Sequence, residues 1–310
     1  MRRTATEILR RGFESVLANW PLLLIRIGES VLLVMIAIVA AVALIVPVLM
    51  SIGIDRMQSY PAGHMMEVFL DIIMNHLAII FYVLIAITLM LVVFVAIHSF
   101  VVAGCVRVYV DAERKNVQVA TPTRNDFRMF SGERWLSGGT KKWWSLFWIY
   151  NIAWGIGGLI MLLPLMAVAG VVFFLRENGP AAAVTGCVGL IFSFLFMFLA
   201  AIVTNVWTQK AIVDCVARNS GAVASLRSAW NEIVSDAGRH IAVAVVMIAV
   251  TIGGSMLFST FSAMGSFDHS GGLMMMPLQF SASIANGIFS AAVGAWFLAS
   301  FSALAVESPS

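Results

Sequence analysis

Residues 31–38 read Val-Leu-Leu-Val-Met-Ile-Ala-Ile and lie inside a run of 25 residues without Asp, Glu, Lys or Arg between Glu29 and Asp55. A helix needs about 20 apolar residues to cross the hydrocarbon core of a bilayer. A strand of a membrane barrel would alternate apolar and polar positions, and this run does not. Because backbone polar groups must pair with one another inside lipid, the run predicts a transmembrane helix.

Five further runs of 28 to 38 uncharged residues follow along the 310-residue chain, in which 61% of residues are hydrophobic and 11% are charged. This composition excludes a soluble enzyme, a secreted disulfide scaffold and a nucleic-acid-binding domain. It predicts an all-α, polytopic integral membrane protein, with residues 1–310 forming one membrane domain. The six transmembrane helices are expected at roughly 24–52, 77–104, 145–174, 181–206, 241–263 and 280–304.

The distribution of Lys and Arg predicts how the chain is oriented. Sixteen of these residues fall in the N-terminal segment and in the second and fourth connections, whereas the opposite side has only Arg56 and Arg176. Lys and Arg are concentrated in cytoplasmic loops. We therefore expect both the N-terminus and the C-terminus to be cytoplasmic, in a bacterial-type inner (plasma) membrane.

Two segments outside the spans have the pattern of amphipathic interfacial helices. Thr4 and Glu7 form a capping-box pattern that starts the first helix. Apolar residues then share a stripe of this helix, with Arg10, Arg11 and Glu14 expected on the other face, and a second such helix precedes the fifth span. The expected membrane-interface residues are Leu9, Phe13, Trp20, Trp143, Trp144, Leu226 and Trp230. The alternative is that these helices pack on the protein itself.

The two amphipathic segments can be overlaid, because Leu9-Arg10 followed by Phe13 matches Leu226-Arg227 followed by Trp230. Residues 124–142 form a poorer third copy, in which glycines weaken the helix. The pattern predicts three units, 1–110, 111–215 and 216–310, each an interfacial helix followed by a transmembrane hairpin. Chance amphipathicity is the alternative explanation.

The stretch Ser225-Leu226-Arg227-Ser228-Ala229-Trp230, which leads into a hydrophobic hairpin, carries a family resemblance. It resembles uncharacterised bacterial multi-span proteins similar to the membrane domain attached to some glycerophosphodiester phosphodiesterases. The match covers mainly residues 205–260. The resemblance implies a helical membrane module without the hydrolase barrel, for which the longest connection, 111–143, leaves no room. Residues 236–240 depart from the expected aromatic run.

Sequence motifs of common membrane enzymes are missing. The chain contains no Gly-x-x-x-x-Gly-Lys, His-Glu-x-x-His or Gly-x-Ser-x-Gly motif, which would indicate nucleotide binding, a zinc protease or a serine hydrolase respectively. The spans also lack adjacent carboxylates for acid–base catalysis. We therefore expect a protein that is not an enzyme and has no cofactor.

Ionisable and polar residues within the spans are the candidates for a transport pathway. Arg26 and Glu29 are three residues apart, so they share a helix face, and a charge within a span is costly to bury. The other polar candidates are His98, Asn151, Asn205 and Asn286. The alternatives are a local ion pair, with Arg26 extending to the headgroups, and hydrogen bonds between neighbouring helices.

The segments on the outer side are rich in Met and His, the ligand types that suit Cu(I). A copper site would involve His64, Met65, His76, His269 and Met275. Consecutive methionines cannot all face one ion, however, and Met is also a flexible apolar filler. The favoured expectation is that no metal site exists.

Two functions follow from these patterns. The first is a non-catalytic inner-membrane protein that organises or assists lipids or a membrane protein partner. The alternative is a small-solute or ion transporter that uses Glu29 and the intramembrane polar residues. Small-x-x-x-small pairs such as Ala153 with Gly157 favour close helix packing and leave homo-oligomerisation open.

Overall fold

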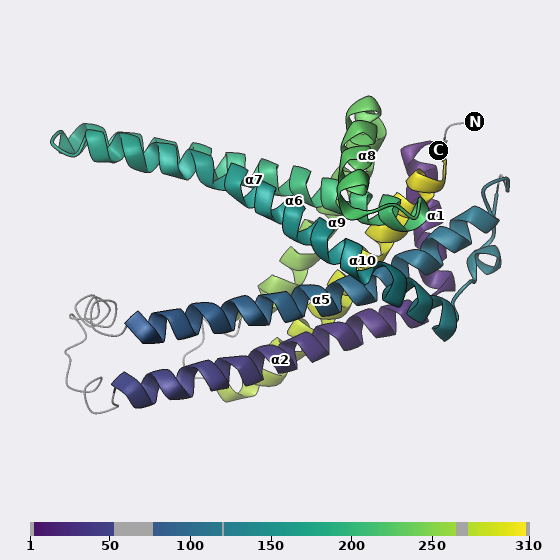
Figure 1. Ribbon diagram of the computed structural model, residues 1–310, viewed down its shortest axis with the longest axis horizontal. Coiled ribbons are helices and arrows are strands. Elements are labelled where there is room, and N and C mark those ends of the chain that lie inside the picture. Colours follow the sequence, from purple (N-terminus) through teal and green to yellow (C-terminus); the bar gives the residue numbers. More distant parts are fainter. Residues whose placement is uncertain (1–2, 53–76, 120, 265–271, 308–310) are drawn as a thin grey trace. The chain divides into compact units, whose positions relative to one another are not determined.

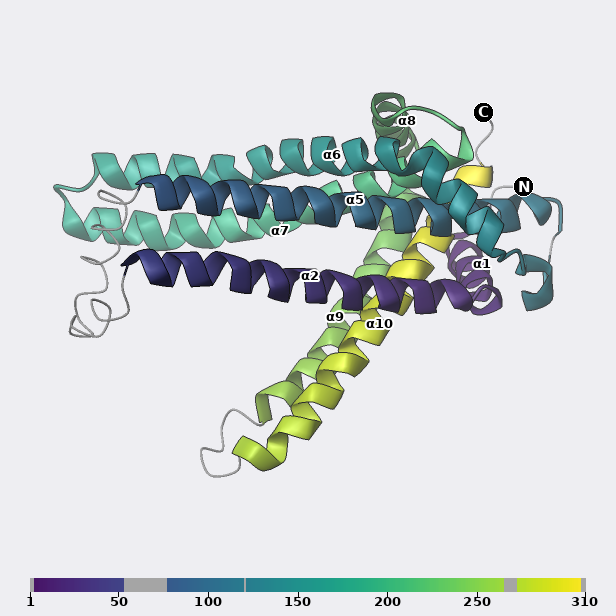
Figure 2. The same cartoon turned by 60° about the horizontal axis from the view of Figure 1, so that its bottom comes forward.

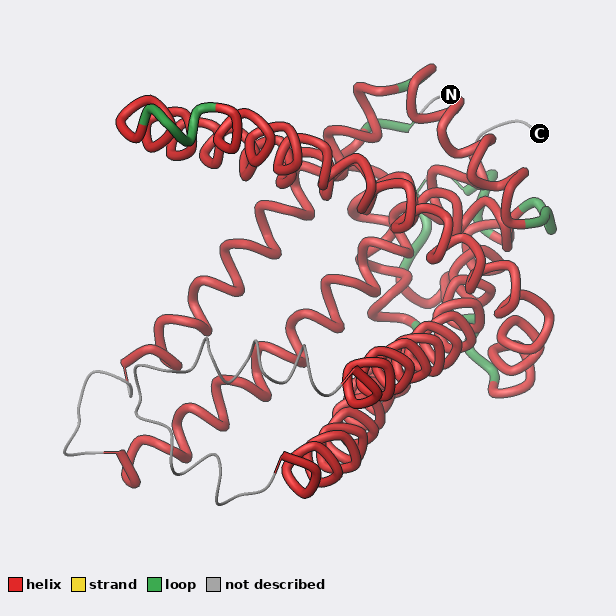
Figure 3. Tube along the Cα trace, turned by 60° about the vertical axis from the view of Figure 1, so that its left-hand side comes forward, coloured by secondary structure: helices red, strands yellow, loops and turns green. Residues whose placement is uncertain are grey.

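The computed structural model describes residues 3–52, 77–119, 121–264 and 272–307, and within them the chain forms helices and turns without any strand (Figure 3). The helices are α1 (Ala5–Ala18), α2 (Pro21–Ile52), α5 (Leu77–Lys115), α6 (Gly132–Phe174), α7 (Gly179–Ala217), α8 (Ala222–Ser235), α9 (Ala237–Met264) and α10 (Gly272–Glu307). A short 3-10 helix, η2, covers Arg124–Phe127. Six of these helices are long and apolar enough to cross a membrane. The predicted all-α polytopic fold is therefore confirmed.

Several spans are longer than the sequence predicted, because charged residues continue the helices. The expected ends at 104 and 206 were set by the first charges that follow the apolar runs, Arg107 and Lys210. Each of these pairs with an aspartate one turn later, Asp111 and Asp214 respectively, at 3.1 and 2.7 Å. Such i,i+4 pairs support a helix, so α5 and α7 extend to Lys115 and Ala217.

The third span begins earlier than expected. Residues 124–142 do not form a separate interfacial helix, because η2 is followed by one continuous helix that begins at Gly132 with a cap from Ser131. Gly138 and Gly139 are buried in α6. A Cβ on either glycine would lie 2.5 to 2.9 Å from the side chains of Arg107 and Phe100 on α5. The glycines thus permit a close helix contact.

The chain divides into two compact units, residues 1–25 with 99–310 and residues 26–98. The second unit contains most of α2 and the first part of α5. The Tyr82 hydroxyl of α5 donates a hydrogen bond to the Ala43 carbonyl of α2, at 3.1 Å. The two helices of this unit are therefore in direct contact.

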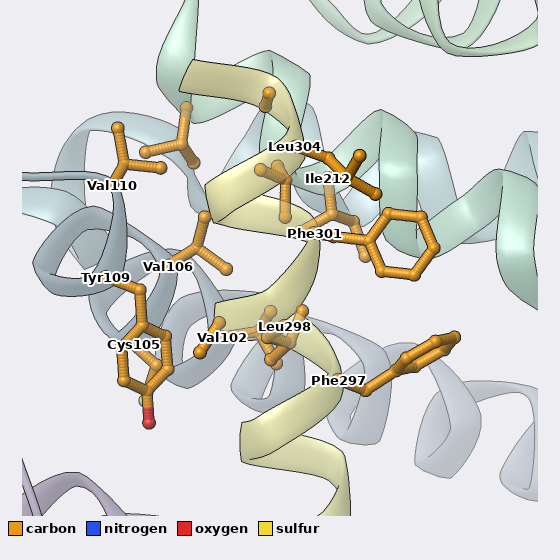
Figure 4. Close-up of a cluster of buried hydrophobic side chains, with 14 of the residues drawn as sticks. Val102, Cys105, Val106, Tyr109, Val110, Ile212, Phe297, Leu298, Phe301 and Leu304 are labelled. Carbon is orange, nitrogen blue, oxygen red and sulfur yellow. The ribbon is translucent and has the colours of Figure 1, made fainter. Parts of the chain in front are cut away.

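The first unit has its core where the charged ends of its helices meet. In this core α1 packs closely on α10. A Cβ on Gly12 of α1 would lie only 2.7 Å from the backbone nitrogen of Ser300 on α10, so the close contact requires glycine. Figure 4 shows side chains of α5, α7 and α10 converging there: Val102, Cys105, Val106, Tyr109, Val110, Ile212, Phe297, Leu298, Phe301 and Leu304. The same hydrophobic core includes Leu9 of α1 and Leu226 of α8, and it therefore holds both helices on the spans.

Away from this core the spans expose apolar side chains. The α6–α7 and α9–α10 hairpins can be followed in Figure 2. In the most hydrophobic 18-residue window of α6 and of α7 only 6% of residues are buried within the protein, against 67% in α10. Water would penalise this exposure heavily, so the surrounding medium must be lipid.

Asn19 fixes the segment that precedes α6. Its amide nitrogen donates to the carbonyls of Ser15 and Phe127, at 2.8 and 2.9 Å. Its amide oxygen accepts from the backbone nitrogens of Met129 and Phe130, at 2.9 and 2.8 Å. A fully satisfied buried amide holds a loop in one place, and here it joins the end of α1 to the segment after η2.

Candidate functional site

The structure brings three of the predicted pathway residues together in the second unit. Glu29 Oε2 lies 2.7 Å from Arg26 Nη1, and Glu29 Oε1 lies 2.6 Å from His98 Nδ1. Arg26 and Glu29 belong to α2 and His98 belongs to α5, so the cluster ties the two helices together. Glu29 is only 5% exposed, and it lies roughly 12 Å along the helix from Pro21. A buried carboxylate in contact with an imidazole is an arrangement that can hold or pass a proton.

The three asparagines are not gathered into one site. Asn151, Asn205 and Asn286 lie on α6, α7 and α10 of the first unit. Asn151 is exposed and donates to the Phe147 carbonyl of its own helix, at 2.7 Å. Within the described ranges no hydrogen bond joins any two of these amides.

A buried carboxylate that the sequence did not predict lies at the core of the first unit. Glu113 is fully buried, and its Oε2 accepts from Nε and Nη2 of Arg11, at 3.1 and 3.0 Å. Arg3 Nη1 lies 3.4 Å from the same oxygen. Arg11 is 1% exposed, so its expected position on the outer face of α1 was wrong. Two arginines around one carboxylate anchor α1 to α5.

A second ion-pair cluster docks α8 on α7. Lys210 Nζ lies 2.7 Å from Asp214 Oδ1 and 2.6 Å from Glu232 Oε2. Arg218 also pairs with Glu232. Burial alone would raise the pKa of Glu232, but the nearby charges of Lys210 and Arg218 outweigh burial and hold this pKa below its ordinary value. Glu232 is therefore ionised at neutral pH and bonds α8 to α7.

Two tryptophans make the same contact with the two amphipathic helices. The Trp296 indole of α10 donates to the Leu9 carbonyl of α1, at 2.8 Å, and its ring packs edge-on against Phe13. The Trp207 indole of α7 donates to the Leu226 carbonyl of α8, also at 2.8 Å, and its ring packs edge-on against Trp230. We call each arrangement a tryptophan latch. The paired leucines and aromatic residues are those that the sequence overlay matched.

The predicted membrane-interface residues divide into two groups. Leu9 and Leu226 are buried in the core of the first unit, where contact with the protein replaces the expected contact with lipid. The others remain at the surface: Phe13, Trp20, Trp144 and Trp230 are exposed, and Trp143 is half-buried. Trp20 lines a hollow together with Arg124 and Arg128. Each amphipathic helix thus contacts both the protein and its surroundings.

An apolar groove of about 620 Å³ runs along the α6–α7 hairpin below α8. Its floor includes Gly157 and Thr204, and the close approach of these two residues brings α6 against α7. Trp207 and Trp230, whose rings pack edge-on, are also part of its lining. Volumes of 300 to 1,000 Å³ are typical of sites for small molecules.

Most of the residues predicted for a copper site lie outside the described part of the chain. His64, Met65, His76 and His269 lie outside the described residues, and Met275 lies within α10. No group of three or more His, Cys, Asp or Glu side chains suited to a metal ion occurs in the part of the chain that the structure describes.

Comparisons with protein families, curated proteins and solved structures return no match to this chain. The resemblance to the membrane domain of glycerophosphodiester phosphodiesterases therefore stays a prediction.

Proposed function

We propose that this multi-pass protein is non-catalytic and organises or assists lipids of the inner leaflet. In this proposal both termini are cytoplasmic, the membrane is a bacterial-type inner membrane, and lipid headgroups surround the amphipathic helices. The charge asymmetry of the connections supports this orientation. A membrane protein partner seated on the same surface is compatible with the proposal.

The direction of α8 and its exposed apolar side chains are the main support for this proposal. Figure 1 shows α8 running across the α6–α7 hairpin, as a helix in the membrane plane would if α6 and α7 cross the membrane. Its outer stripe exposes Val223, Trp230 and Val234, which are 69%, 46% and 62% exposed. Water is a poor environment for such a stripe, whereas the boundary between headgroups and acyl chains accommodates it.

Cationic side chains lie beside these apolar groups, which favours binding to a membrane surface of anionic lipids. Arg227 lies on the same stripe of α8, between Val223 and Trp230, and forms no ion pair with any described residue. Its aliphatic stem can lie along lipid while the guanidinium binds a phosphate. At the other amphipathic helix, Trp20 lies beside Arg124 and Arg128, a combination typical of headgroup depth.

Nitroxide labels on α8 test this proposal in the full chain, reconstituted in bilayers with the exposed Cys187 replaced by Ala. Labels go on cysteines at Val223 and Val234. The matched controls are Ala224 and Ser235, which are exposed on the same helix about 100° around its axis from the labelled positions. We expect oxygen to relax the first pair of labels and a water-soluble nickel complex to relax the second. Equal access of the nickel complex to all four positions would contradict the proposal.

The second candidate is a carrier of protons or small ions, and the Arg26–Glu29–His98 cluster favours it. Glu29 is a buried acid in contact with a base and a cation contributed by two spans. Groups of this kind mark proton relays in membrane proteins. This candidate requires that protonation of Glu29 be part of the transport cycle.

Proton flux into proteoliposomes separates the two candidates. A carrier would dissipate an imposed pH gradient, as followed by a trapped dye, and Glu29→Gln would abolish the flux while leaving the protein folded. Glu133→Gln is the control, because Glu133 is exposed in the first turn of α6. A flux equal to that of empty vesicles, or one unchanged in Glu29→Gln, counts against the carrier.

A further inference from the structure

We infer that the groove along α6 and α7 holds one acyl chain of an inner-leaflet phospholipid, with its headgroup beside Arg227 of α8. The inference rests on the proposed function and names the ligand at a particular place. It assigns a role to a cavity that neither the charge pattern nor the amphipathic pattern predicted.

The lining of the groove selects an apolar chain. Its walls are formed mainly by Ile160, Phe196, Leu199 and Val203, and Ala200 keeps its floor open. Thr204 is the only hydroxyl among the described lining residues, and it is buried. A polar solute would lose its hydrogen bonds to water in such a groove, whereas a methylene chain loses none.

The length of the groove matches one leaflet. On α7 the lining residues extend from Phe196 to Trp207, which is roughly 16 Å along a helix. Half of a hydrocarbon core is about 15 Å. A chain lying parallel to α7 would therefore fill the groove from the tryptophans to the middle of the bilayer.

The tryptophan end of the groove is suited to a lipid headgroup. Trp207 is held in place by its hydrogen bond to Leu226 and packs against Trp230. Tryptophan at headgroup depth has an apolar ring and a polar N–H group. Arg227 is exposed one helical turn from Trp230 and forms no ion pair in the described part of the chain. Arg227 is not part of the groove lining, but it lies one helical turn from Trp230, which is part of it. Its positive charge complements the phosphodiester of a lipid whose acyl chain occupies the groove.

The test uses a phosphatidylglycerol that carries a diazirine on one acyl chain, in nanodiscs that hold the full chain. After illumination, we expect cross-links to concentrate on residues 156–160 and 196–207. In Ala200→Phe the new ring fills the groove, and cross-linking there should fall about tenfold, the loss expected when two buried methylene contacts are displaced. Ala183→Phe is the control, because Ala183 is exposed on α7 away from the groove.

The outcomes separate this inference from the proposed function. Cross-links spread evenly over the exposed apolar faces of the spans, or unchanged by Ala200→Phe, would overturn the groove site. If the nitroxide labels on α8 still contact lipid, the proposed function stands without the groove. If those labels are exposed to water, the proposed function itself fails.

Discussion

Glu113 shows how individual charges hold this protein together. It is fully buried and has no charge partners other than Arg3 and Arg11 among the described residues. Burying a charge is costly, and removing one member of a buried group leaves the others uncompensated. The sequence could have indicated this role of Arg11, because Arg11 is three residues after Ile8 and four before Ser15, both of which are buried on α1.

We predict that Glu113→Gln destabilises the protein by about 3–5 kcal/mol, the usual cost of leaving buried cations without their partner. The measurement is the free energy of unfolding in mixed micelles. Glu133→Gln serves as the control, because Glu133 is exposed in α6. If both variants unfold like the wild type, Glu113 does not anchor α1.

Residue-scale contacts between spans could be predicted only in part. Arg26 and Glu29 are three residues apart in one helix, so sequence spacing placed them together. That His98 contacts Glu29 depends on how two helices are rotated about their axes, and hydropathy carries no such information. The asparagines at 151, 205 and 286 were identified by the same criterion, and the fold does not join them.

At the scale of elements, the two tryptophan latches give α1 and α8 equivalent positions. Each amphipathic helix receives an indole hydrogen bond from a span of another proposed unit, α10 for α1 and α7 for α8. This equivalence supports the proposal that 1–110 and 216–310, two of the three repeat units predicted from the sequence, are related. The repeat unit 111–215 differs, because its residues 132–142 are the first turns of α6 and form no separate helix.

We predict that Trp207→Phe and Trp296→Phe have similar effects. Each substitution keeps an aromatic ring and removes one hydrogen bond to a backbone carbonyl, which should lower the free energy of unfolding by about 1 kcal/mol. Trp154→Phe is the control, because Trp154 is exposed and its indole donates no hydrogen bond to any described residue. A marked loss in only one of the two variants would argue against equivalent latches.

Acid should release α8 from α7. The pKa of Glu232 is held below its ordinary value of 4.5 in the folded protein. Its contribution to stability is therefore complete above that pH and is lost as the pH falls through the lower, folded value. A nitroxide at Val234 should become more mobile in this acidic range. Glu232→Gln should make the label mobile already at neutral pH, and an unchanged label in that variant would contradict the account.

At the scale of the whole molecule, hydropathy predicted the six spans because lipid solvates each apolar run directly. It did not predict which helix faces are buried. The core formed by the ends of α5, α7 and α10 combines residues far apart in the sequence. The apolar groove likewise exists only because α6 and α7 are close at Gly157, with α8 across them.

Native mass spectrometry of the gently extracted full chain tests the central claim most directly. We expect the protein to retain phospholipid in a fixed ratio, and we expect Arg227→Gln combined with Ala200→Phe to lose about tenfold in occupancy. Ala183→Phe should retain lipid like the wild type. A protein that carries no lipid, or one that carries a small solute in its place, would contradict the lipid-organising account and favour the carrier built around Glu29.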